Sequence, residues 1–100
     1  MNQTIKINNN YYTIEFTNAQ NPSLQGGEAL GLCNTTSKVI FISKDLSNKQ
    51  DILRHEIVHA VLYEYLSVDI TWTSEKVCEF YQRYYQIIED LVNQVIIQEE

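Results

Sequence analysis

The sequence predicts an α+β domain: a small, twisted antiparallel sheet packed on one helix that carries the chemistry, with a further helix at the C-terminal end. Two observations predict this fold. Apolar residues recur at every second position in the first half of the chain and at every third or fourth position in the second half. The chain has 100 residues with one proline and three glycines, which leaves little room for a linker. Residues 1–100 are therefore expected to form a single domain.

The first half of the sequence is typical of two β-hairpins. Apolar side chains alternate with polar ones over residues 5–7 and 12–16, and three consecutive asparagines lie between these runs. Asparagine tolerates the positive φ angles of tight turns, so a hairpin is expected here. Residues 18–27, with an Asn-Pro and a Gly-Gly pair, are expected to form a loop. A second hairpin is predicted from Ala29–Cys33 and Val39–Ser43.

After Ser47 the apolar spacing becomes helical. Ser47 and Gln50 form a capping-box pattern, in which each side chain bonds the backbone N–H of the other residue. The spacing that follows predicts a helix from about Asn48 to about Leu66. After a short connector, a second helix is predicted from Glu75 to about Gln98.

The charge balance excludes several classes of function. The net charge is −6, from 7 basic and 13 acidic side chains, and no basic run occurs. Nucleic acids and anionic membrane surfaces both attract clustered lysines and arginines, which this chain lacks. The N-terminal residues also lack the long apolar run of a secretion signal. We therefore expect a cytoplasmic protein that binds neither nucleic acid nor membranes, with Cys33 and Cys78 as reduced thiols.

Residues 55–59 read His-Glu-Ile-Val-His, the HExxH pattern of zinc peptidases. On a helix, side chains four residues apart lie on one face, so His55 and His59 can reach the same Zn²⁺ ion. Glu56 lies about 100° around the helix from His55, where it can act as a general base on water bound to the metal. The competing interpretation is a pair of structural or surface histidines on an amphipathic helix.

A catalytic zinc site needs a third protein ligand, with water in the fourth position. The extended metzincin pattern is excluded because Leu62 and Tyr65 replace its glycine and third histidine. A carboxylate from the following helix is the other common solution. Glu75 is favoured because it lies in the first turn after the connector, and Glu79 is the alternative. Cys78 is also a possible ligand, although we expect it to be a small buried residue.

Several segments, taken in order, give the chain a likeness to a known family. They are Gly31-Leu32-Cys33-Asn34, the strand Val39–Ile42, the motif segment Leu53–Ala60 and the segment Glu75–Phe80. With these parts the sequence resembles the minimal HExxH metallopeptidases of bacteriophages and mobile elements, which are related to the ImmA/IrrE-like, gluzincin-like proteins. The resemblance covers nearly the whole chain, but only the HExxH segment is highly specific. It implies a zincin-like fold.

The resemblance also implies roles for particular residues and a class of substrate. His55 and His59 correspond to zinc ligands, Glu56 to the general base and Glu75 to the third ligand. The family often takes part in phage lysogeny control or stress regulation, with a repressor-like protein as substrate. The chain departs from that pattern because it has no helix-turn-helix domain, and no oxyanion-stabilising tyrosine or histidine can be assigned.

The sequence therefore predicts a zinc metallopeptidase that hydrolyses a peptide bond in a protein or peptide substrate. Gly31–Cys33 is the candidate edge strand that would bind an extended peptide by backbone hydrogen bonds. One alternative is a catalytically silent, zinc-containing binding protein or antirepressor. Another is a structural zinc site, which Glu56 argues against because such a site needs no general base. The sequence leaves the oligomeric state open.

Overall fold

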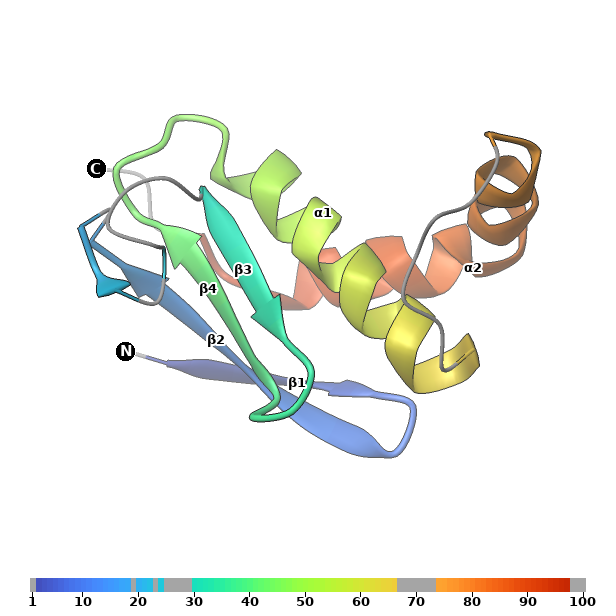
Figure 1. Ribbon diagram of the computed structural model, residues 1–100, viewed down its shortest axis with the longest axis horizontal. Helices are drawn as coiled ribbons and strands as arrows, with labels where there is room; N and C mark the ends of the chain where they lie inside the picture. Colours follow the sequence, from blue (N-terminus) through green and yellow to red (C-terminus); the bar gives the residue numbers. More distant parts are fainter. Residues whose placement is uncertain (1, 19, 23, 25–29, 67–73, 98–100) are drawn as a thin grey trace.

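The computed structural model describes residues 2–18, 20–22, 24, 30–66 and 74–97, except for the side chains of residues 74, 75 and 77 (Figure 1). A four-stranded sheet is followed by two helices that pack on it. The elements in chain order are β1 (Gln3–Ile7), β2 (Asn10–Thr17), β3 (Gly31–Asn34), β4 (Val39–Ser43), α1 (Lys49–Val61), η2 (Leu62–Leu66) and α2 (Ser74–Gln94). The predicted α+β class and the order of strands before helices are confirmed.

The sheet has the strand order β1-β2-β4-β3 and is mixed, whereas a wholly antiparallel sheet was predicted. The two hairpins, β1–β2 and β3–β4, are antiparallel as expected, but β2 and β4 pair in parallel. The reason lies in how the hairpins are joined. The end of β2 and the start of β3 lie at the same end of the sheet. Strand β3 therefore runs antiparallel to β2, and β4, which lies between them, runs parallel to β2. The antiparallel prediction is therefore wrong at this central pair.

Period-two alternation places one side of each strand in the core. The turn between β1 and β2 contains Asn8 with φ 56°, the positive value that an asparagine accepts at low cost. One face of the sheet packs on the helices, and its opposite face is partly exposed at Leu32, Val39 and Phe41. The buried core combines strand residues with helix residues: Ile5, Ile7, Tyr12, Ile14, Ile40 and Ile42 with Leu53, Ile57, Val61, Ile88 and Val92.

The two helices divide this face of the sheet between them. Helix α1 runs alongside β3, and α2 crosses α1 and reaches β1 at the other edge (Figure 1). Arg54 on α1 makes a bidentate ion pair with Glu89 on α2, with N–O distances of 2.8 and 3.0 Å. Within the described part of the chain, no helix combines the length and the apolar character needed to cross a bilayer.

The predicted helices agree with the observed ones in their central residues and differ from them at some of their ends. The N-cap of α1 is Asn48 without a side-chain hydrogen bond, so the capping box predicted from Ser47 and Gln50 does not form. The Asn48 carbonyl instead accepts the amides of Asp51 and Ile52 at 3.1 and 3.3 Å. At its other end α1 continues as the π-helical turn η2 to Leu66, where the first predicted helix also ends. Helix α2 is shorter than predicted.

Candidate metal centre

The two histidines of the HExxH motif lie side by side on the exposed face of α1. Their Nε2 atoms are 3.2 Å apart, and the rings meet edge to face with centroids 4.9 Å apart. Two nitrogens that each lie 2.0–2.1 Å from a tetrahedral zinc would be roughly 3.3–3.4 Å apart. The same contact can be a hydrogen bond when one nitrogen carries a proton. The separation of the two Nε2 atoms is therefore close to that of two nitrogen ligands of one zinc ion.

Glu56 follows His55 on α1, and its side chain is buried against β3 of the sheet. Only 7% of its surface is exposed, and its carboxylate accepts a hydrogen bond from the backbone N–H of Cys33 on β3. Burial raises the pKa of the Glu56 carboxyl, while nearby His55 and the Cys33 amide limit the rise. The carboxylate therefore lies against β3, on the residue that follows His55 in the helix.

Strand β3 forms one edge of the sheet, next to α1, as the sequence predicted for Gly31–Cys33. The Leu30 carbonyl accepts the Ser43 amide at 3.0 Å, which makes Leu30 and Ser43 a hydrogen-bonded pair. Such pairs alternate along an antiparallel ladder. The N–H and C=O groups of Gly31 and Cys33 therefore point away from β4, towards the free edge. An added peptide strand would meet these groups, except the Cys33 N–H, which donates to Glu56.

The third ligand is not brought to the histidines by the residues whose side chains are described. Among them, no group of three or more His, Cys, Asp or Glu side chains is arranged to hold a metal ion. The favoured ligand, Glu75, lies in the first turn of α2, but its side chain is outside the described residues. The alternative, Glu79, is exposed and faces Lys76, with Nζ and Oε2 3.9 Å apart.

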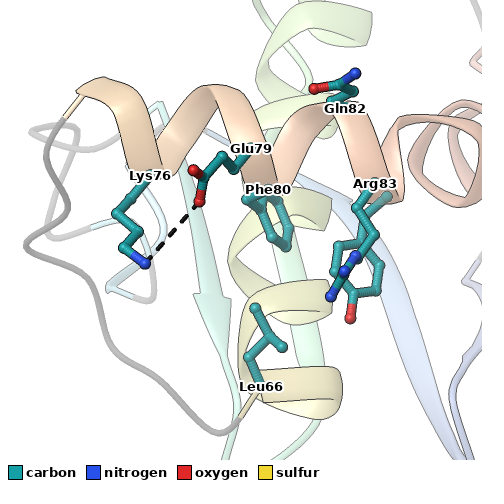
Figure 2. Close-up of a pocket in the computed structure, with 7 residues that line it drawn as sticks. Leu66, Lys76, Glu79, Phe80, Gln82 and Arg83 are labelled. Carbon is teal, nitrogen blue, oxygen red and sulfur yellow. Dashed lines mark ion pairs between the residues drawn. The ribbon is translucent and has the colours of Figure 1, made fainter.

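Glu79 instead lines an open pocket of about 600 Å³ between α2 and the end of η2 (Figure 2). Leu66 and Phe80 form its apolar part, while Lys76 and Arg83 add positive charge. The sequence did not predict this pocket, because it forms only where η2 approaches α2.

A hydrogen-bonded cluster around Glu64 is a feature that sequence reasoning missed. The carboxylate of Glu64 accepts hydrogen bonds from Asn10, Tyr12 and Lys38, each 2.6 Å long. Asn8 donates a further bond, of 3.0 Å, to the Glu64 backbone carbonyl. Burial by itself would raise the pKa of Glu64, but these donors outweigh it and hold the pKa below its usual value. The cluster ties the end of the HExxH helix to both hairpins.

The two cysteines are free thiols in different surroundings. Cys33 is partly buried, and burial together with nearby Glu56 and Glu64 raises its pKa to about 12. Its thiol is therefore protonated at neutral pH and is a poor metal ligand. Cys78 was expected to be buried but is exposed, because its side of α2 does not pack against α1 or the sheet.

Comparison with protein-family models, with curated proteins and with solved structures gave no significant match. The fold is therefore described by its own topology.

Proposed function

We propose that the chain is a zinc-dependent metallopeptidase in which His55 and His59 hold the metal and Glu56 is the general base. The observation that carries the proposal is the 3.2 Å separation of the two Nε2 atoms beside a buried carboxylate on the same helix. A structural zinc site would have no need of that carboxylate. Glu75 is proposed as the third ligand, with Glu79 as the alternative.

The proposed reaction adds water across a peptide bond. When bound, zinc supplies a positive charge that polarises the scissile carbonyl and lowers the pKa of a coordinated water. Glu56 would accept a proton from the attacking water, whose oxygen bonds to the carbonyl carbon, and would pass the proton to the nitrogen of the leaving amine as the C–N bond breaks. The raised pKa of the Glu56 carboxyl favours the first of these steps, because the carboxylate is then a stronger base.

The free edge of β3 is the proposed binding site for an extended peptide substrate. It lies beside α1, so a peptide paired with this edge would pass close to the histidines. The backbone groups available are the N–H and C=O of Gly31 and the C=O of Cys33, since the Cys33 N–H is already donated to Glu56. An added strand gains affinity from such main-chain bonds and specificity from its side chains.

A comparison of the wild-type protein with Glu56→Gln tests this function. Both proteins, loaded with zinc, are incubated with bacterial lysates, and new protein termini are identified by mass spectrometry. We expect fragments with the wild type that fall by about 10²–10⁴-fold with Glu56→Gln, because glutamine cannot accept the proton. Identical fragment patterns would contradict catalysis. Retention of the same partner by both proteins without cleavage would favour the silent binding protein.

A further inference from the structure

Two backbone features of β3 meet the carboxylate of Glu56. The first is the N–H of Cys33, which points to the free edge of the sheet and donates to the carboxylate. The second is Gly31, which has no Cβ atom and so leaves room for the Glu56 side chain. A Cβ atom at Gly31 would lie 3.1 Å from Cγ and 3.2 Å from Oε2 of Glu56. It would also lie 2.7 Å from Cγ2 of Ile52, one helical turn earlier.

These contacts restrict where the carboxylate can lie. Glu56 has three rotatable side-chain bonds, and on an exposed helix face it would sample many positions. A buried carboxylate needs hydrogen-bond donors, and the Cys33 amide provides one from a strand that is fixed by pairing with β4. Gly31 lets the helix come close enough for this bond to form. A general base must lie within about 2.6–3.2 Å of the proton that it takes, so its position decides whether it can work.

We propose that Gly31 and the backbone amide of Cys33 position the general base, by fixing Glu56 against the edge of β3. This inference rests on the proposed function for the catalytic role of Glu56. The hydrogen bond itself does not depend on that role. Gly31 is a positioning residue that acts through Glu56, and the strand edge proposed to bind substrate is also the edge that orients the base.

Amide hydrogen exchange at Cys33 in the metal-free protein tests the proposal without a substrate. The Cys33 N–H has no strand partner, so its protection reports the bond to Glu56. A hydrogen bond to a charged group should slow exchange by about 10- to 100-fold, and Glu56→Ala should remove this protection. Gly31→Ala should remove most of it too. In the Glu56→Ala background, Gly31→Ala should have no further effect on Cys33 exchange, because the hydrogen bond to Glu56 is already absent.

Two further variants separate this contact from general damage to packing. Gly31→Ala combined with Ile52→Ala removes the closest clash with α1 but keeps the crowding of Glu56, so Cys33 should still exchange fast. Leu32→Ala alters the opposite face of the same strand and should leave Cys33 protected. If Gly31→Ala alone does not fold, Cys33 exchange in the Gly31→Ala, Ile52→Ala protein tests the proposal.

Equal exchange of Cys33 in the wild type and in Glu56→Ala would overturn the proposal, as would full protection in the Gly31→Ala, Ile52→Ala protein. The exchange measurements do not depend on peptidase activity. A protein without activity would therefore contradict the proposed function but not the contact between β3 and Glu56. With a cleavable substrate, Gly31→Ala, Ile52→Ala should lower kcat by about 10- to 100-fold relative to Ile52→Ala, because the base is displaced. Zinc affinity should change little, because neither substitution removes a proposed metal ligand.

Discussion

The Nζ atom of Lys38 and the Oε2 atom of Glu64 lie 2.6 Å apart where the end of the HExxH helix meets the sheet. Only 5% of the Glu64 side chain is exposed, against 28% for Lys38. The Lys38 ammonium also lies over the ring of Tyr63, 4.9 Å from its centroid. The pair joins the turn before β4 to the π-helical turn η2, so it fixes the end of the helix whose preceding turns carry the histidines.

Glu64→Gln should destabilise the metal-free protein by about 1–3 kcal/mol at pH 7, because the buried side chain at position 64 would lose its charge-assisted hydrogen bonds from Lys38 and Tyr12. The folded-state pKa of Glu64 is lowered, so its contribution is fully present above the unfolded value, about 4.3. It is lost as pH falls through the folded pKa. Urea unfolding at pH 7 and at progressively lower pH measures this dependence.

The matched control for that series is Glu15→Gln, an acidic residue of β2 outside the cluster, which should change stability by less than about 0.5 kcal/mol. The difference between wild type and Glu64→Gln should shrink steadily as the solution is acidified. A difference that stayed constant down to about pH 3 would show that Glu64 contributes by packing and not by charge.

The two cysteines should react with thiol reagents at very different rates. The Cys33 pKa of about 12 leaves almost no thiolate at pH 8, so its alkylation should be roughly 10³-fold slower than that of an ordinary exposed thiol. Cys78 is exposed and should react first. Mass spectrometry of the native protein over time should show one rapid and one slow addition. Cys78→Ser should abolish the rapid one, and a rapid addition that persists would place Cys33 at the surface.

The third ligand can be assigned by competition with a chelator. Glu75→Ala should weaken zinc binding strongly, because it removes a direct metal bond. Glu79→Ala should weaken it by at most about 10-fold, as expected of a group outside the coordination sphere. Lys76 faces Glu79 and also lines the pocket, so Lys76→Ala is a control that alters the pocket without removing a candidate ligand. The reverse order of effects would assign the role to Glu79.

Local patterns in the sequence were sufficient to predict most of the elements. The alternation around Ile5 and Tyr12 and the helical spacing after Ser47 depend on neighbours within a few residues, so the hairpins and α1 were predictable. The parallel pairing of β2 with β4 was not, because it joins strands of two different hairpins that lie far apart in the sequence. The capping box failed because the helix begins at Lys49, with Asn48 as its cap.

The candidate site was also only partly predictable from the sequence. The relation of His55 to His59 follows from helix geometry and could be derived from their spacing. Glu64 could not be recognised, since its side-chain donors lie between 26 and 54 positions away in the sequence. The contact of Gly31 with Glu56 likewise exists only once β3 and α1 are packed together. Glu75 stays a prediction from the motif and its spacing.

The zinc content of the purified protein tests the central claim most directly. Wild type, Glu56→Gln and the His55→Ala, His59→Ala double variant are dialysed with zinc, freed of excess metal and measured by elemental analysis. We predict about one zinc per chain in the wild type and in Glu56→Gln, because the glutamate makes no metal bond. The double variant should hold almost none. Equal zinc in all three proteins would contradict the account.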